Sequence, residues 1–227
     1  MSRNPFKNLT KFEWCLWIMS LLAVCTSLLF GAEDYLSFFA SMIGVTALIF
    51  VAKGDIYGQI LTVIFSILYG IVSYTFCYYG EMITYLGMSL PAALMSVFTW
   101  LKNPYKEDNS EVKVNKIKPP EYLFLAILAA AVTIMFYFIL RYFNTPNLLF
   151  STISVTTSFG ASYLLMRRSP YYAVAYACND IVLIVLWVLA TIESISYISM
   201  VICFIMFFAN DIYGFYNWKK MRKHQVN

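Results

Sequence analysis

The chain has 227 residues, of which 61% are hydrophobic and only 12% charged, and its formal net charge is +4. Soluble domains carry roughly a quarter charged residues, so this composition excludes an ordinary soluble globule. It predicts a polytopic membrane protein, because apolar helices of roughly 20 residues satisfy their own backbone hydrogen bonds inside a bilayer.

Eight hydrophobic segments follow one another along the chain, and we expect each to cross the bilayer as a helix. They are residues 12–31, 35–53, 55–79, 82–101, 121–142, 147–166, 171–192 and 195–217. The first has no small-residue cleavage signal and is followed directly by further spans. We therefore expect a retained helix rather than a signal peptide.

Lysine and arginine are distributed unevenly in this eight-helix topology. Of the 16 basic residues, all but Arg141 fall on one side of the bilayer. Because translocation disfavours Lys and Arg in short loops, the distribution places both termini in the cytoplasm. The polar stretch 102–120 is then a cytoplasmic linker, and we expect a multi-pass protein of a plasma membrane.

Two parts of the chain resemble copies of one three-helix unit. "VAKGDIY" and "LMRRSPYY" each place basic residues after the first helix of a unit, and Trp100 and Trp218 each precede a lysine near the end of the third. An odd-numbered unit needs an inverting helix before a copy of the same orientation. The predicted fold is all-α, with eight transmembrane helices arranged as 1+3+1+3 and two parallel repeats.

The predicted organisation follows from these repeats. It consists of an N-terminal helix (1–34), a first repeat (35–101), a cytoplasmic linker (102–120), an inverting helix (121–146), a second repeat (147–218) and a basic tail (219–227).

Cysteine and histidine give no sign of a reactive centre. The five cysteines are scattered through apolar stretches without a C-x-x-C pair, and the only histidine, His224, lies in the basic tail. A nucleophile with its base, a set of metal ligands or paired catalytic carboxylates near an interface would be typical of a membrane enzyme. We therefore predict no catalytic residue, no metal site and no cofactor.

Polar residues form a stripe on the second helix of the first repeat. In "DIYGQILTVIFSILYGIVSY", Gln59, Thr62 and Ser66 fall, with Tyr69 and Ser73, within an arc of about 80° at helical spacing. Amides are costly near the middle of a membrane, whereas Ser and Thr also serve helix packing.

A second stripe lies in "YYAVAYACNDIVLIVLW", where Tyr172, Tyr176, Asn179 and Asp180 share one face of the predicted helix 171–192. A charged Asp at a helix centre costs ~3 kcal/mol and normally faces a cavity or a partner. Asp180 could be protonated, bonded to a neighbour such as Asn210, or solvated by a cavity. A substrate-facing role and a structural hydrogen bond both remain open.

The last helix adds Asn210 and Tyr213 on one face, and Asp211 is better explained as structural. Together these helices predict a pocket between the repeats, with amides, one carboxylate and flat aromatic faces that suit a small, ring-containing polar solute. The predicted substrate-binding residues are Gln59, Thr62, Ser66, Tyr172, Tyr176, Asn179, Asp180, Asn210 and Tyr213.

The chain resembles the PnuC family of vitamin and nucleoside transporters, whose fold is similar to that of the SWEET sugar carriers. The resemblance covers nearly the whole chain and is carried by "YGEMITYLGMSLPAALMSVFTWLKN", "YYAVAYACNDIVLIVLW" and "FANDIYGFYNWKK". It implies facilitated diffusion of nicotinamide riboside by alternating access, with a cytoplasmic kinase trapping the solute. Thiamine, riboflavin and deoxynucleosides are other solutes of this family.

The family's W-x-x-W-x-x-x-N motif is altered in this sequence. Ala173 and Tyr176 stand at the two tryptophan positions, and Asp180 stands at the asparagine. A shift of one residue would instead place Asn179 there, so the register is open, and so is the exact solute.

One alternative function is the substrate-binding membrane subunit of a multi-component vitamin uptake system. The expected partners of the chain are the small-molecule substrate, the lipid bilayer and a functionally linked cytoplasmic kinase, with no nucleic acid. A homo-oligomer remains open, as does coupling to a proton or another ion.

Overall fold

The computed structural model describes residues 5–26, 35–75, 79–105, 111–193 and 198–226. Within these ranges the regular secondary structure is helical, apart from an isolated bridge between Pro104 and Val112. A short 3₁₀ helix, η1 (Pro5–Asn8), precedes α1 (Lys11–Thr26). The remaining helices are α2 (Tyr35–Ala52), α3 (Ile56–Thr75), α4 (Tyr79–Thr84), η3 (Tyr85–Ser89), α5 (Leu90–Leu101), α6 (Pro119–Tyr142), α7 (Leu148–Met166), α8 (Tyr172–Glu193) and α9 (Ile198–Val226).

The helices α4, η3 and α5 form one continuous span, in which η3 is a π-helical turn. Counted this way, the described residues contain eight long helices. Six of them are long and apolar enough to cross a membrane, while the apolar part of α2, Phe38–Ala52, is shorter. The predicted all-α membrane fold with eight helices is thereby confirmed.

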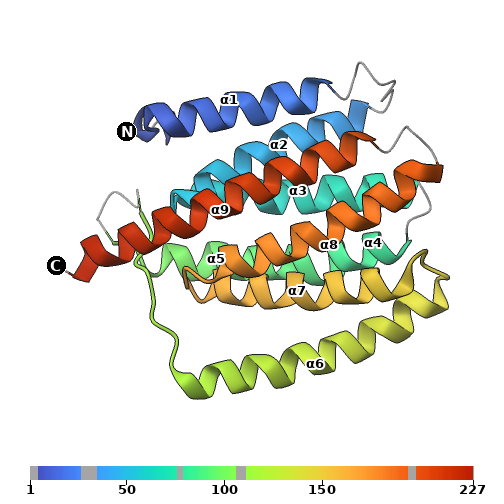
Figure 1. Cartoon of the computed structure of the whole chain (residues 1–227). Coiled ribbons are helices and arrows are strands. Elements are labelled where there is room, and N and C mark those ends of the chain that lie inside the picture. The colour runs from blue at the N-terminus through green and yellow to red at the C-terminus, as the bar shows by residue number, and fades with distance from the viewer. Residues whose placement is uncertain (1–4, 27–34, 76–78, 106–110, 194–197, 227) are drawn as a thin grey trace.

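Six helices of the two repeats pack as a ring. Neighbours around it are α2 with α3, α3 with α5, α5 with α7, α7 with α8, α8 with α9, and α9 with α2. The two remaining helices lie outside the ring, where α1 packs on α2 and α9, and α6 packs on α7. Figure 1 shows α1 and α6 at opposite edges of the bundle.

The turns that follow the first helix of each repeat have the same geometry. Gly54 and Arg168 both adopt left-handed backbone conformations, with φ of 70° and 59°. The residue after each one caps the next helix: a side-chain oxygen of Asp55 accepts a hydrogen bond from the backbone N–H two residues later, as the Ser169 hydroxyl does. The resemblance between the basic turns therefore extends to the backbone.

The ends of the helices differ from prediction mainly at α9. This helix continues to Val226, nine residues past the predicted end at residue 217, so the described part of the basic tail is helical. The tail is rich in helix-forming Lys, Met and Arg, and Gln225 anchors it by bonding to the backbone of Val112 and Val114. Residues 27–31, 76–78 and 195–197 of the predicted spans lie outside the described residues.

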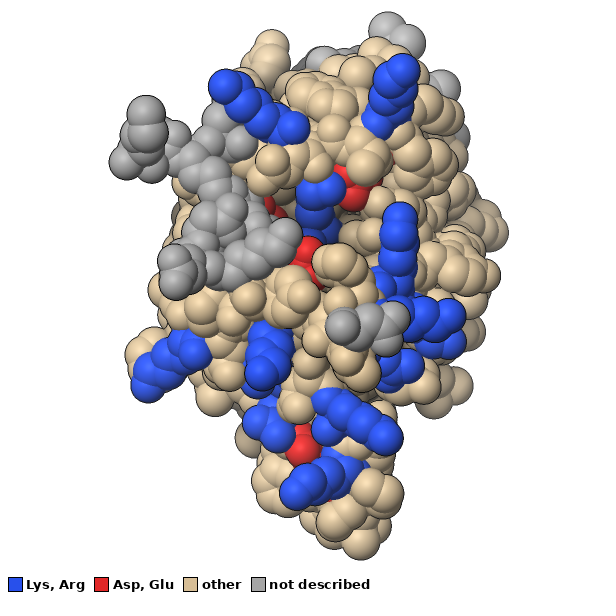
Figure 2. All heavy atoms as spheres, turned by 90° about the vertical axis from the view of Figure 1, so that its left-hand side faces the viewer, with Lys and Arg blue, Asp and Glu red and all other residues tan. Residues whose placement is uncertain are grey.

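The N-terminal end of α1 and the C-terminal end of α9 lie on one face of the molecule, which we call the basic face. Figure 2 shows Lys and Arg side chains spread over this face. Beneath it lies a core cluster that includes Val51, Trp100, Leu165, Tyr172 and Trp218. The core therefore closes the ring at its basic end. The cytoplasmic location of the basic face stays a prediction.

The two left-handed turns allow a matched test of stability. A Cβ on Gly54 would lie 2.5 Å from the Met221 methyl carbon and would have to adopt a positive φ. We expect Gly54→Ala to destabilise the protein by roughly 1–2 kcal/mol. Arg168→Gly removes a side chain from a residue with a left-handed backbone conformation, and it should change stability by less than about 1 kcal/mol. Thermal melting of both variants in detergent checks this, and equal losses would contradict it.

Candidate substrate-binding site

Two polar side chains of α3 are buried without a partner. Gln59 is 0% exposed, and neither its amide oxygen nor its amide nitrogen has a hydrogen-bond partner. The hydroxyl of Ser66, two turns further along, is also unpaired. Thr62 differs, because its hydroxyl donates to the Gly58 carbonyl of its own helix. An unpaired buried amide is unfavourable by ~1–3 kcal/mol, so Gln59 and Ser66 require an explanation beyond packing.

Asp180 of α8 lies against a second carboxyl group. It is 2% exposed, its Oδ2 atom has no partner, and its side chain is in hydrogen-bonding contact with that of Asp211 on α9. Among the described residues, no ion pair brings a Lys or Arg to these two acids. Two negative charges so close together repel strongly in a low-dielectric interior. The pair therefore suits a cationic ligand or a shared proton.

Aromatic rings gather beside this acidic pair. Tyr69 of α3 and Tyr85 of η3 lie with ring centroids 4.3 Å apart. Phe65 contacts both rings and also Phe207 of α9, at 6.3 Å. Tyr85 is close enough to Asp180 for the two groups to interact electrostatically. The cluster brings together residues of both repeats and presents flat faces next to a carboxyl group.

Tyr85 owes its position to the π-helical turn. The backbone N–H of Leu90 bonds to the carbonyl of Tyr85, five residues earlier. Pro91, which follows directly, has no N–H and cannot continue the α-helical pattern. Such turns occur frequently at functional sites.

Asn179 faces α7 rather than the acidic pair. Its Oδ1 accepts hydrogen bonds from Ser154 at 3.0 Å and from Thr157 at 2.9 Å. It borders a cavity of about 20 Å³, enough for about one water molecule. The cavity is lined by Glu81, Thr84, Tyr85, Ser89, Leu140, Ser151, Ser154, Val155, Ser158, Asn179 and Leu183. A nucleoside-sized ligand needs a far larger space, so its entry requires the helices to move apart.

The two tyrosines of α8 have different surroundings. The hydroxyl of Tyr176 hydrogen-bonds to that of Ser162 on α7, at 2.8 Å. Tyr172 lies in the core at the basic end, 4.9 Å from the Trp218 ring, and its hydroxyl has no hydrogen-bond partner.

The predicted site residues of α9 bind to α1. Asn210 donates from its amide nitrogen to the Ser20 hydroxyl at 3.1 Å and to the Met206 carbonyl, while its Oδ1 atom is buried without a partner. Tyr213 donates to Glu13 at 2.7 Å. The structure therefore leaves side-chain atoms of Gln59, Ser66 and Asp180 buried without a hydrogen-bond partner, whereas Asn210 and Tyr213 of α9 donate hydrogen bonds to α1.

Two residues beside the candidate site, Asp211 and Tyr85, are not among the site residues predicted from the sequence. The sequence predicts a structural role for Asp211, whereas the structure brings its side chain into contact with Asp180. Its position next to Asn210, a predicted site residue, is the sequence feature that could have indicated this contact. Tyr85 lies in an apolar run whose only signals are Gly87 and Pro91. Two polar residues of α7, Ser154 and Thr157, bond to Asn179.

Comparison with known proteins is consistent with this architecture. A family described as nicotinamide mononucleotide transporter matches residues 34–220. The nicotinamide riboside transporter PnuC of Neisseria mucosa is 26% identical, and the match covers 97% of this chain and 86% of that protein. The Haemophilus influenzae protein of the same name is 22% identical over 84% of this chain and 82% of its own length.

A crystal structure of the vitamin B3 transporter PnuC superposes with a TM-score of 0.81 at 25% identity, covering 96% of this chain and 94% of that one. The predicted resemblance is confirmed by these matches. Because the matched region spans all three helices of both repeats, the chain belongs to the nicotinamide mononucleotide transporter family, together with the PnuC proteins.

Proposed function

We propose that this protein carries nicotinamide riboside, or a closely related nucleoside or vitamin, across the membrane. The observation that carries the proposal is the set of unpaired polar groups of Gln59, Ser66 and Asp180 inside the ring. These groups are buried, and Asp180 lies close to Tyr85 of the aromatic cluster. The names of the two curated relatives support the choice of solute.

The chemistry of nicotinamide riboside matches these groups. Its pyridinium ring carries a positive charge, which the carboxyl groups of Asp180 and Asp211 would balance. Its flat ring fits the faces of Tyr69 and Tyr85. The Gln59 amide can both donate and accept, so it can bind a carboxamide or a ribose hydroxyl.

The same groups favour a nucleoside over a nucleotide. A phosphate calls for fixed cations such as Arg or Lys. The predicted spans contain no basic residue apart from Lys53 and Arg141 at their ends, and the acidic pair would repel a phosphate. The ligand we propose is therefore the riboside rather than the mononucleotide.

The proposed mechanism is facilitated diffusion by alternating access. The two three-helix repeats would rock against each other and expose the site first on one side of the membrane and then on the other. A kinase in the cytoplasm would phosphorylate the solute and trap it there.

Transport by the chain alone is the first test. Proteoliposomes that contain only the purified protein should accumulate radiolabelled nicotinamide riboside to equilibrium without ATP. Excess unlabelled riboside should compete, and the mononucleotide should not. A lack of uptake that is restored only by an added ATPase subunit would instead identify a subunit of a multi-component system.

Asp180→Asn tests the acidic pair. Because it removes a charged partner, we expect the affinity for nicotinamide riboside to fall by about 10-fold to 100-fold. The matched control is Thr62→Val, which should leave affinity within about twofold because the Thr62 hydroxyl bonds to its own helix. Binding is measured by titration calorimetry in detergent. A normal affinity in Asp180→Asn would show that the site is misplaced.

Gln59→Leu separates binding from stability. Since the Gln59 amide has no partner in the protein, an apolar side chain of similar size should leave the melting temperature unchanged or raise it. The affinity for the riboside should nevertheless fall by about threefold to tenfold. If the variant is destabilised and binds normally, the amide serves the fold and not the ligand.

A further inference from the structure

The helices that precede the two repeats share one ion-pair arrangement. Glu13 lies in the first turn of α1 and accepts a hydrogen bond from Lys53, at the end of the next helix, at 2.9 Å. Glu121 lies in the first turn of α6 and binds Arg167, which directly follows α7, the next helix. Each leading helix is thus joined to its own repeat by the same type of contact.

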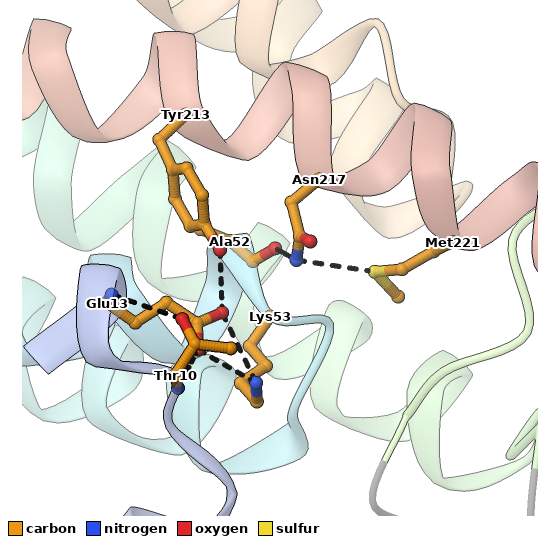
Figure 3. Close-up of polar contacts among 7 residues, drawn as sticks. All are labelled: Thr10, Glu13, Ala52, Lys53, Tyr213, Asn217 and Met221. Atoms are coloured by element: carbon orange, nitrogen blue, oxygen red, sulfur yellow. Dashed lines mark hydrogen bonds and ion pairs between the residues drawn. The ribbon is translucent and has the colours of Figure 1, made fainter.

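The two acids differ in what else they bind. Glu121 is 19% exposed, and its further donor is Tyr163 of α7, so it joins only α6 to α7. Glu13 is 1% exposed, and its further donor is Tyr213 of α9, which belongs to the other repeat. Figure 3 shows Glu13 between Lys53 and Tyr213. One buried carboxylate therefore connects α1, α2 and α9.

The carboxylate of Glu13 is also fixed by its own helix. The backbone N–H of Thr10 donates to Glu13 Oε2 at 2.6 Å, and the backbone N–H of Glu13 donates to the Thr10 hydroxyl at 3.3 Å. This reciprocal pair is a capping box, which holds the acid in place at the start of the helix.

The ring has two places where the repeats meet at the basic end. We call them the α2–α9 seam and the α5–α7 seam, and their hydrogen bonds are equivalent. Trp218 donates to the Val51 carbonyl at 2.9 Å across the first seam. Trp100 donates to the Leu165 carbonyl at 3.2 Å across the second. The two indole rings meet between the seams, with centroids 5.5 Å apart.

A second hydrogen bond accompanies each tryptophan. The Asn217 amide donates to the Ala52 carbonyl at 2.9 Å, and the Thr99 hydroxyl donates to the Met166 carbonyl at 3.1 Å. In these hydrogen bonds the two seams match each other.

An alternating-access carrier must open its basic end in one half of the cycle, so at least one seam has to separate.

Among the described residues, the hydrogen bonds of α1 reach both sides of the α2–α9 seam, whereas those of α6 reach α7 alone. In addition to Glu13, α1 bonds to α2 through Trp17 and Thr46, at 3.0 Å, and to α9 through Ser20 and Asn210, at 3.1 Å. Opening this seam would separate the buried Glu13 carboxylate from either Lys53 or Tyr213, and hydrogen bonds to a charged group are roughly twice as strong as neutral ones. Among the described residues, the side-chain hydrogen bonds that Trp100 and Thr99 make across the α5–α7 seam are neutral.

We propose that Glu13 is a positioning residue that holds the α2–α9 seam closed throughout transport, so that the repeats pivot there and the basic end opens at the α5–α7 seam. This inference rests on the proposed alternating-access function. It assigns a role to α1, which lies outside the matched family region 34–220.

Reversible cross-links test the pivot. In a background with the five native cysteines replaced by alanine, the pairs Ala52→Cys with Asn217→Cys and Thr99→Cys with Met166→Cys cross-link one seam each. With the α2–α9 seam oxidised, uptake of nicotinamide riboside should stay within about twofold of the reduced protein. With the α5–α7 seam oxidised, it should fall at least about tenfold and recover on reduction. The reverse pattern, or loss of uptake in both, would overturn the proposal.

A second measurement does not depend on the solute. Ser66→Cys, inside the ring, is combined with each pair and labelled with a membrane-impermeant maleimide applied from the basic side. It should react when the α2–α9 seam is cross-linked and be protected when the α5–α7 seam is cross-linked. Protection by the α2–α9 cross-link alone would overturn the pivot. If the Ser66→Cys protein is labelled as expected but the wild-type protein takes up no riboside, the result counts against the proposed solute only.

Glu13→Gln and Glu121→Gln form a matched pair, since both remove a carboxylate that binds a basic residue. Glu13→Gln should lower the maximal uptake rate by about tenfold with KM within about twofold, because the pivot loosens while the binding site is intact. Glu121→Gln should leave both parameters within about twofold. Equal effects of the two variants, or a change confined to KM, would contradict the positioning role.

Discussion

The structure depends on a constraint that the bilayer imposes on polar groups. Inside the membrane, a polar side chain must find its partner within the protein, because water is scarce. Most polar side chains in this chain do so: Thr62 bonds to its own helix, and Asn179 bonds to α7. Gln59, Ser66 and Asp180 have atoms that do not. We propose that a solute supplies the missing partners of these exceptions.

The same constraint explains the difference between the two seams. The repeats are alike in their turns and in the tryptophans that join them, yet one seam also carries a buried carboxylate from outside the repeats. A buried acid with three different donors is much harder to separate than a pair of neutral hydrogen bonds. An internal symmetry of this kind can therefore produce an asymmetric movement.

Much of the fold could be predicted, because hydrophobic length and the positions of Lys and Arg are properties of the sequence alone. The repeats could also be recognised, since Trp100 and Trp218 occupy equivalent places in them. The continuation of α9 to Val226 could not, because it depends on the contact of Gln225 with the linker. Glu13 lies at the start of the predicted span 12–31, and only the packing of the helices shows that it contacts Tyr213 of α9. For the site, helical spacing predicts that Gln59 and Asp180 lie on polar stripes, but it could not reveal which neighbour satisfies each group.

The most direct test of the central claim is an experimental structure of the protein with nicotinamide riboside bound. The account predicts the ligand inside the ring, with its pyridinium next to Asp180, its ring against Tyr69 or Tyr85, and a hydrogen bond to Gln59. A ligand bound elsewhere, with Gln59 and Asp180 still unpaired, would contradict it.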